Sequence, residues 1–374
     1  MKVEGGIEKL EWGLLILDWG RGFGEEEWER RNPAPIGRTQ TPLKTCKNLA
    51  SLFANLKNMT EEKKFIWIPE VMETQEIDLP ILREKGVRLS LRRLDRVHSL
   101  VSGNKFFKLK YNVVEARRQG KNTLLTFGGA FSNHIHAVAA AGKVLGFKTI
   151  GIIRGEETNP LNPTLEYAKS SGMRLHYVDR HGYRNKTERN FLEDLKNQFG
   201  DFFLIPEGGT NAWAIEGTKE IILEKDRHFS HTSVAIGTGG TFAGLAASLH
   251  SHQTLLGFSS LKGDFIHREL NTLLEGHHIK PKGKTRILDQ YHFGGYSKHS
   301  PELIDFLLGF YEQTGIPLDP IYTGKMMFGL LDQTRKDAFV QGSHILAIHT
   351  GGLQGIQGFN ERFGANLPYT SLDK

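Results

Sequence analysis

Short apolar runs alternate with helical patterns along most of this chain, and this alternation restricts the possible folds more than any other feature. Runs such as Lys148–Arg154, Met173–Asp179 and His344–Thr350 have the length of single strands. The stretches Ser132–Leu145 and Pro160–Ser171 have a helical pattern, and each is followed by glycine. Such a sequence predicts an α/β protein with mostly parallel, twisted sheets and helices on both faces.

The first 64 residues depart from this pattern. They carry clusters of glycine, proline and charge without a helical or strand period. We interpret residues 1–64 as a poorly ordered extension, or as upstream sequence included by a misassigned start. The alternative is an accessory segment that packs on the rest of the protein.

Composition excludes several classes of protein. Cys46 is the single cysteine, which rules out a disulfide framework or a cysteine-based zinc site within one chain and favours a reducing, cytoplasmic setting. The histidine pairs lack carboxylate partners at helical spacing, so we expect no metal site. No apolar run is long enough to span a bilayer. The net charge of +6 is spread along the chain, which permits nucleic-acid binding without arguing for it, and a small anionic ligand fits equally well.

Two glycine-rich loops each follow an apolar run and precede a helix, which is where parallel sheets bind ligands. In Gly128–Ala137, Ser132 and Asn133 stand at the start of a helix and predict either a helix cap or an anion site. The second loop lacks the lysine of a Walker A motif, and Phe242 replaces the third glycine of a dinucleotide motif. We expect this loop to bind a phosphate. It consists of Gly237, Thr238, Gly239, Gly240 and Thr241.

A lysine-rich segment and two tyrosines supply candidate reactive groups. Lys105 directly follows the turn-forming residues 102–104, and Lys108 and Lys110 follow within six positions. Tyr296 and Tyr322 each lie near glycine, where a phenol either transfers protons or packs. A reactive lysine, a phosphate loop and proton-handling tyrosines without a metal together indicate pyridoxal 5′-phosphate as the cofactor.

These motifs also carry a resemblance to a known family. From about Ile77 to the C-terminus, the sequence resembles the 1-aminocyclopropane-1-carboxylate deaminase / D-cysteine desulfhydrase family of fold-type-II, tryptophan-synthase-β-like pyridoxal phosphate enzymes. The family's GNKxxKL motif stands at residues 103–109, and its GGxxSNH loop stands at residues 128–134. Its phosphate loop resembles residues 237–241, and its two active-site tyrosines match Tyr296 and Tyr322.

The resemblance implies roles for these residues. Lys105 would form the Schiff base with the cofactor. Ser132, Asn133 and the backbone beside His134 would bind the substrate carboxylate, and Asn133 would also face the cofactor's phenolic oxygen. We further expect a homodimer, a small amino acid as substrate, and no nucleic-acid or membrane partner. The expected large cofactor-binding domain covers residues 65–118 and 216–374, with a small α/β domain, residues 119–215, inserted in it.

Two positions separate the branches of the family. In the ring-opening deaminases they resemble Glu and Leu, whereas in the desulfhydrases both are Ser or Thr; this sequence has Thr323 and Thr350. A neutral hydroxyl at the pyridine nitrogen suits the elimination of a good leaving group, so the chain resembles the desulfhydrases, which convert D-cysteine to pyruvate, sulfide and ammonia. Departures from the family at Ser102, Phe106-Phe107 and Phe293–Ser297 border the substrate pocket. Ring-opening deamination, and elimination from D-serine, chloroalanine or cysteate, therefore remain alternatives.

Overall fold

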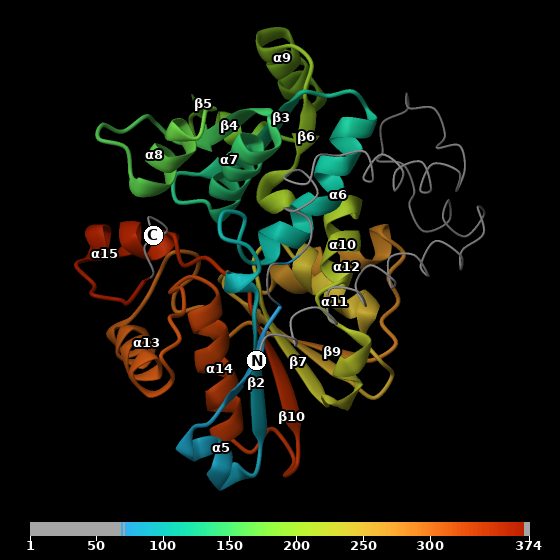
Figure 1. Ribbon diagram of the computed structural model, residues 1–374, viewed down its shortest axis with the longest axis vertical. Coiled ribbons are helices and arrows are strands. Elements are labelled where there is room, and N and C mark those ends of the chain that lie inside the picture. The colour runs from blue at the N-terminus through green and yellow to red at the C-terminus, as the bar shows by residue number, and fades with distance from the viewer. Residues whose placement is uncertain (1–68, 70–71, 370–374) are drawn as a thin grey trace, which may run out of the picture. The chain divides into compact units, whose positions relative to one another are not determined.

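The computed structural model describes Pro69 and residues 72–369 of the chain. These residues belong to one compact unit, Ile66–Lys374, and the extension expected at residues 1–64 lies outside them. Within the described part, strands and helices alternate and form two separate sheets (Figure 1). The α/β class expected from the sequence is confirmed.

The larger sheet has six strands in the order β1-β2-β10-β7-β8-β9, and all neighbours are parallel except β1 and β2. Its strands are β1 (Thr74–Ile77), β2 (Arg88–Arg93), β7 (His231–Ile236), β8 (Thr254–Ser259), β9 (Lys284–Leu288) and β10 (His344–His349). The smaller sheet has four parallel strands in the order β5-β4-β3-β6. Its strands are β3 (Thr123–Gly129), β4 (Lys148–Arg154), β5 (Met173–Val178) and β6 (Phe203–Ile205).

Helices occupy most of the connections between strands. They are α5 (Pro80–Lys85), α6 (Asn104–Arg118), α7 (Asn133–Leu145), α8 (Pro163–Ser170), α9 (Arg189–Phe199), α10 (Ala212–Lys219), α11 (Gly240–Ser248), α12 (Phe265–Gly276), α13 (Pro301–Thr314), α14 (Thr323–Arg335) and α15 (Gly355–Phe363). Short 3₁₀ turns form at η1 (Leu94–Arg96), η2 (Gly182–Asn185), η3 (Glu207–Gly209) and η4 (Glu224–His228).

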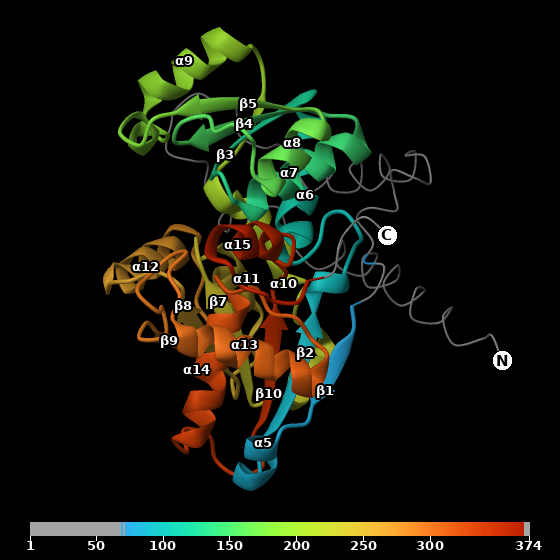
Figure 2. The same ribbon diagram turned by 90° about the vertical axis from the view of Figure 1, so that its left-hand side faces the viewer.

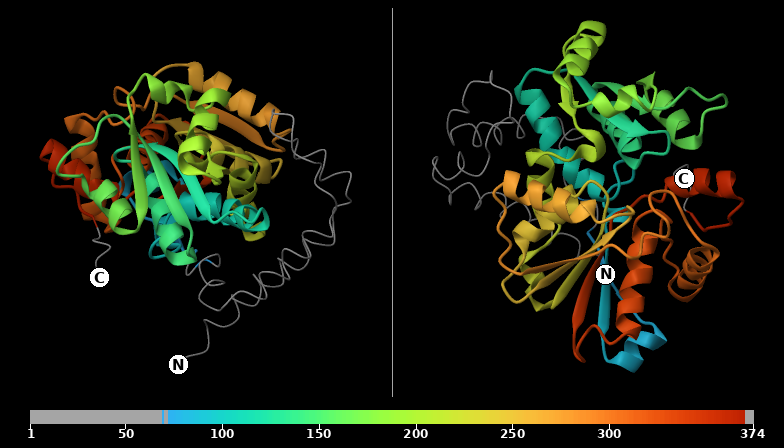
Figure 3. Two further views of the ribbon diagram at one scale, coloured as in Figure 1. Left: turned by 90° about the horizontal axis from the view of Figure 1, so that it is seen from above. Right: turned by 180° about the vertical axis from the view of Figure 1, so that it is seen from behind.

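Both faces of the larger sheet are covered, as the sequence predicts. Strand β10 is buried throughout, and its alternate residues enter different cores: Leu346 and Ile348 pack with α6, α11 and α12, whereas Ile345 and Ala347 pack with α13 and α14. Figures 1 and 3 show α13 and α14 on one side of the sheet and α10–α12 on the other. A parallel strand that is apolar on both faces reads as a continuous apolar run, which is why β10 is visible in the sequence.

Strand β2 was not expected, because two arginines interrupt its apolar pattern. Arg92 is 1% exposed and forms a bidentate ion pair with Asp226, with both N···O distances 2.7 Å. Arg93 is also buried and pairs with Asp95. Arg92 and Arg93 are therefore internal, and neither side chain contributes to an exposed basic surface.

The pair Phe106-Phe107 has a structural explanation. Both rings are buried at the start of α6 and meet edge to face, with centroids 5.3 Å apart. Phe106 also stacks on His98. The carbonyl of Phe107 lies so close to α10 that a Cβ at Gly217 would approach it to 2.0 Å. These two residues thus fix α6, and with it the lysines that α6 carries.

Candidate active site

Lys105 lies in the first turn of α6, and the turn before it is tied to the end of β10. The N–H of Asn104 donates to the carbonyl of Thr350 at 3.1 Å. Gly103 has φ +71°, and a Cβ there would lie 2.2 Å from that same carbonyl, so only glycine fits. The amine of Lys105 donates to Oδ1 of Asn104 at 3.0 Å. Burial lowers the pKa of Lys105 to about 8, and the charge of Asp319 limits the fall.

The loop Gly237–Thr241 joins β7 to the N-terminus of α11. Gly239 caps the helix with φ +81°, and the first intrahelical bond runs from Ala243 N–H to the carbonyl of Gly239. The N–H groups of residues 240–242 precede that bond, so they face outward at the positive end of the helix. Asn104 Nδ2 donates to Thr241 Oγ1 at 2.8 Å, which joins this loop to the turn that carries Lys105.

Lys108 is the second cation of this region, and the sequence left its role undecided. It is 2% exposed, and its amine donates to the carbonyl of Gly208, Thr210 Oγ1 and Thr238 Oγ1 at 2.9 to 3.3 Å. A Cβ at Gly240 would lie 3.1 Å from this amine, so Lys108 stands directly against the loop. Burial, together with the charge of Lys105, lowers the pKa of Lys108 well below its usual range.

Ser132 caps α7, as one of its two sequence interpretations predicts. Its hydroxyl oxygen accepts hydrogen bonds from the N–H groups of His134 and Ile135 at 3.2 and 3.3 Å. The side chain of Asn133 lies next to the loop between β10 and α15, where Gln354 donates to its Oδ1 at 2.7 Å. His134 is buried, and its Nε2 lies 2.8 Å from Thr126 Oγ1. Burial and then the charges of Lys105 and Lys108 lower the pKa of His134 well below 6.5, so its imidazole is neutral.

The two tyrosines lie together. Their ring centroids are 6.0 Å apart, and a Cβ at Gly237 would lie 3.0 Å from the ring of Tyr322. Burial, followed by Tyr296 and Asp319, raises the pKa of Tyr322 well above its usual value, so this phenol keeps its proton at neutral pH. Lys325 fixes the Tyr296 loop, because its buried amine donates to the carbonyls of His292 and Gly295 at 2.9 Å.

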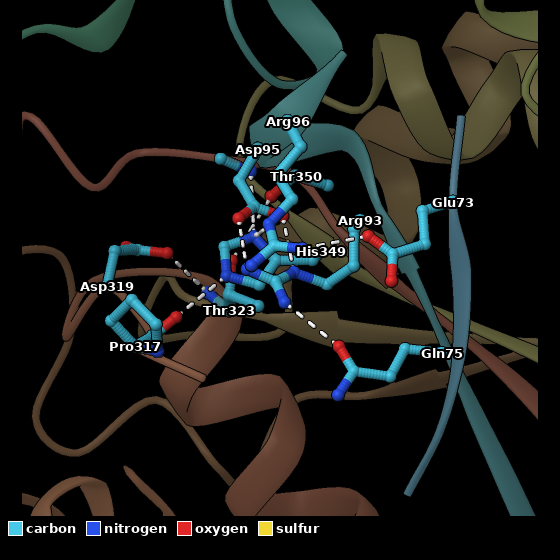
Figure 4. Close-up of polar contacts among 11 residues, drawn as sticks. Glu73, Gln75, Arg93, Asp95, Arg96, Pro317, Asp319, Thr323, His349 and Thr350 are labelled. Carbon is cyan, nitrogen blue, oxygen red and sulfur yellow. Dashed lines mark hydrogen bonds and ion pairs between the residues drawn. The ribbon is translucent and has the colours of Figure 1, made fainter. Parts of the chain in front are cut away.

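Thr323 and Thr350 face each other with their hydroxyl oxygens 3.5 Å apart. His349 ties the strand end that carries Thr350 to the loop that precedes Thr323. Its Nε2 donates to the carbonyl of Pro317 at 2.9 Å, and its Nδ1 accepts from the N–H of Gly351 at 3.2 Å. Figure 4 shows this polar cluster, in which Asp95 lies 3.6 Å from His349 Nδ1. Burial alone would raise the pKa of Asp95, but His349 and Arg93 outweigh it and lower that pKa.

Asp319 is a site residue that the sequence reasoning missed. It is 1% exposed, and its carboxylate accepts the N–H groups of Ile321, Tyr322 and Thr323 at 2.8 to 3.0 Å. A Cβ at Gly352 would lie 3.1 Å from the carboxyl carbon. The signal was present as an Asp-Pro pair four residues before Thr323, which is typical of a capped helix start.

A cavity of about 840 Å³ opens beside these groups. Asn133, Asp319, Tyr296 and Tyr322 line it together with segments from both sheets. Residues 72–369 contain no group of three or more His, Cys, Asp or Glu side chains placed to hold a metal ion. Among the described helices, none is long and apolar enough to cross a membrane.

The donor set fits pyridoxal phosphate. The outward N–H groups of α11, the hydroxyls of Thr238 and Thr241, and the cation of Lys108 suit a phosphate. The amine of Lys105, with a pKa of about 8, suits a bond to the aldehyde carbon of the cofactor. The hydroxyls of Thr323 and Thr350 could bind a pyridine nitrogen. The turn that carries Lys105, the loop Gly237–Thr241 and Tyr322 thus lie together.

Comparison with known proteins gives three kinds of match. The family model described as "pyridoxal-phosphate dependent enzyme" matches residues 69–351. A putative 1-aminocyclopropane-1-carboxylate deaminase of Pyrococcus abyssi is 31% identical over 298 residues, which cover 75% of this chain and 89% of that protein. A crystal structure described as an "ACC deaminase homologue" matches with a TM-score of 0.68 at 28% identity, covering 81% of this chain and 98% of the other.

Two further relatives carry the second activity in their names. The mitochondrial bifunctional D-cysteine desulfhydrase/1-aminocyclopropane-1-carboxylate deaminase of Arabidopsis thaliana is 31% identical, covering 72% of this chain and 74% of the relative. The D-cysteine desulfhydrase of Serratia proteamaculans is 29% identical, covering 71% of this chain and 87% of the relative. Because both names occur among the relatives, the similarities alone do not separate the two activities.

Proposed function

The chain belongs to the family of pyridoxal-phosphate-dependent enzymes, and on that premise we propose that it eliminates a β-substituent from a small amino acid. The products would be a 2-oxo acid, ammonia and the released substituent. D-cysteine, which would yield pyruvate, sulfide and ammonia, is the reference substrate. The observation that carries this choice is the pair of hydroxyls on Thr323 and Thr350, 3.5 Å apart.

These two hydroxyls bear on the choice of reaction because they would give a pyridine nitrogen a neutral partner. A carboxylate at this position would hold that nitrogen protonated, whereas a neutral hydroxyl does not. Asp319 lies nearby, but three backbone N–H groups already hold its carboxylate. The neutral pair therefore supports elimination of a good leaving group over opening of a cyclopropane ring.

In the proposed reaction, each residue has a defined task. Pyridoxal phosphate, when bound, supplies an electron sink for the α-carbon of the amino acid. Lys108 and the N-terminus of α11 bind the phosphate. The backbone beside His134, with Ser132 and Asn133, binds the substrate carboxylate at the start of α7, where the helix dipole favours an anion.

Proton transfer falls to Lys105 and the two tyrosines. The amine of Lys105, with a pKa of about 8, is close enough to neutrality to take the α-proton. Tyr322 keeps its proton at neutral pH and can give it to a leaving group. Tyr296, 42% exposed beside Tyr322, is placed to exchange that proton with solvent.

A substrate panel on the purified holoenzyme tests the proposal. D- and L-cysteine, D-serine and 1-aminocyclopropane-1-carboxylate would be scored for 2-oxo acid and, where relevant, sulfide. We expect 2-oxo acid from at least one β-substituted amino acid. Activity on the cyclopropane alone would refute β-elimination and establish the deaminase alternative. Lys105→Ala should remove the visible absorbance of the bound cofactor, and a persisting band would refute the role of Lys105.

We also propose the finer organisation. All strands of the smaller sheet fall between Thr123 and Ile205, which supports a small domain at residues 119–215 inserted between residues 65–118 and 216–374. The single cysteine supports a cytoplasmic location, and the resemblance to the family supports a homodimer. Light scattering on the purified protein would test the homodimer, and limited proteolysis would test the domain boundaries.

A further inference from the structure

The cavity beside Tyr296 and Tyr322 carries a concentration of positive charge that the proposed reaction does not use. Its charged lining consists of Arg154, Arg180, Arg184, Lys186, Lys298 and Arg362, against Asp319 as a carboxylate. Of these cations, Lys186 pairs with Glu207 at 3.4 Å. The whole chain has 48 Lys and Arg against 42 Asp and Glu, so cations are strongly enriched here. A cleft lined by one sign of charge concentrates ligands of the opposite sign.

Arg154 is the cation closest to the substrate loop. It ends β4 and pairs in register with Gly129, which begins the loop leading to Ser132. A Cβ at Gly129 would lie 3.5 Å from Nη2 of Arg154. No carboxylate in the described part of the chain pairs with this guanidinium. Its central carbon lies 5.8 Å from the ring centroid of Tyr183.

A second arginine reaches the same loop from the C-terminal helix. Arg362 extends from α15, and its guanidinium carbon lies 5.6 Å from the ring centroid of Phe131. Helix α15 packs against α8 (Figure 2). The cavity is lined both by residues of the smaller sheet, such as Gly129 and Arg154, and by residues of α15. An anion in the cavity would therefore be within the field of cations from both sides.

Neither the cofactor nor the α-carboxylate accounts for these cations. The phosphate loop and Lys108 do not contribute to the lining of this cavity. The substrate carboxylate already has the start of α7, with Ser132 and Asn133. A thiol, with an ordinary pKa of about 8.5, is mostly neutral at pH 7 and leaves the cations without a partner.

Resting on the proposed function, we infer that the substrate is an amino acid with a second anionic group on its side chain, and that Arg154 recognises this group. Sulfonate, phosphate and carboxylate share the required chemistry, because each accepts the paired N–H donors of a guanidinium. In elimination from a sulfonate, the α-proton passes to Lys105, the Cα–H electron pair forms the Cα–Cβ double bond, and the Cβ–S pair leaves with sulfite. Water then replaces the amino group to give pyruvate and ammonium, and no redox partner is required.

Binding of aspartate and asparagine tests the inference directly, since the two have nearly the same shape and differ by one charge. Isothermal titration of both enantiomers into the holoenzyme should show that aspartate binds about tenfold tighter or more, which corresponds to about 1.4 kcal/mol. Arg154→Gln should abolish this preference, and Arg362→Gln should reduce it. Arg286→Gln is the matched control, because Arg286 is exposed on β9 outside the cavity and its loss should change nothing.

Turnover separates this inference from the proposed function. The holoenzyme should act on cysteate or O-phosphoserine with a kcat/KM at least about tenfold above that for D-cysteine or D-serine. Turnover of D-cysteine without this preference, or equal binding of aspartate and asparagine, would overturn the inference and leave the proposed function intact. Selective binding of aspartate without turnover of any β-substituted amino acid would refute the proposed function and uphold the anionic specificity.

Discussion

The amine of Lys105 should titrate near pH 8, far below a free lysine. Burial lowers its pKa from 10.5 to about 8, with Asp319 as the charge that opposes the fall. At pH 7 this change raises the neutral fraction of the amine about 300-fold, from roughly one molecule in 3,000 to about one in ten. A neutral amine is the form that attacks an aldehyde, so this lowered pKa supports the proposed role of Lys105.

Competitive labelling of the apoprotein would measure this pKa. Traces of acetic anhydride would be applied from pH 6 to 11, with free Nα-acetyl-lysine in the same tube, and acetylation of Lys105 would be quantified by peptide mass spectrometry. The labelling rate should rise to half its plateau near pH 8. A midpoint at or above pH 10 would refute the argument from burial. In Asp319→Asn the midpoint should fall further, because the charge that favours the protonated amine is gone.

The same titration predicts how stability depends on pH. Because the pKa of Lys105 is lowered on folding, the unfolded chain binds more protons between pH 8 and 10.5, and stability rises with pH in that window. Below about pH 8 the loss of folding stability caused by burying the charged amine is fully present, with an upper bound of about 3 kcal/mol. Lys105→Met should therefore stabilise the apoprotein at pH 7 in urea denaturation, and the gain should vanish toward pH 10.5. A variant that is equally stable or less stable at pH 7 would contradict this reasoning.

Three further substitutions test other parts of the site. Gly103→Ala should destabilise the protein by at least about 3 kcal/mol, because the new Cβ meets a carbonyl at 2.2 Å and φ is +71°. Lys108→Met should weaken the binding of pyridoxal 5′-phosphate at least about tenfold and leave the affinity for unphosphorylated pyridoxal unchanged, because it removes the amine donor beside Thr238. Tyr322→Phe should lower kcat by about 10²- to 10⁴-fold and leave cofactor absorbance intact, because only the phenol is lost.

Gly103→Ala has a control in the same chain, and the other two substitutions each have an outcome that would refute them. Gly120 has φ +69°, and no atom lies within 4 Å of the position that a Cβ would occupy there, so Gly120→Ala should cost only about 1 kcal/mol of backbone strain. Equal costs at Gly103 and Gly120 would refute the clash. For Lys108→Met, equal loss of affinity for both forms of the cofactor would point to misfolding instead of phosphate binding. For Tyr322→Phe, an unchanged kcat would exclude the phenol from proton transfer.

Strands that are apolar on both faces could be predicted from the sequence, because a strand buried on both sides has an uninterrupted run of apolar residues. This holds for β4 and β10. Strand β2 could not be predicted, because its Arg92 and Arg93 are buried with ion-pair partners, and the partner of Arg92 is 134 residues away. A sequence read locally treats such arginines as surface residues, since the ion pair that allows their burial arises only on folding.

The reactive groups of the site were predictable where a motif fixes local geometry. Lys105 after Gly103-Asn104, and the hydroxyls of Thr323 and Thr350, lie together as the motifs imply. The capping of α7 by Ser132 could be named only as one of two alternatives, since a cap and an anion site require the same residue type. Lys108 could not be assigned, because its acceptors come from loops about 100 residues further along the chain.

The groups proposed for the chemistry and those proposed for specificity belong to different sheets. Thr350 follows β10, and the turn that carries Lys105 is bonded to its backbone, so the reactive end of the site depends on the larger sheet. Arg154 ends β4 of the smaller sheet, where it pairs in register with Gly129. Replacing Arg154 therefore need not move Lys105. Because the two sets are separate, the leaving group bound in the cavity can change without a change in the chemistry at the α-carbon. Replacement of Arg154 should therefore alter kcat/KM for different substrates and leave the pKa of Lys105 unchanged.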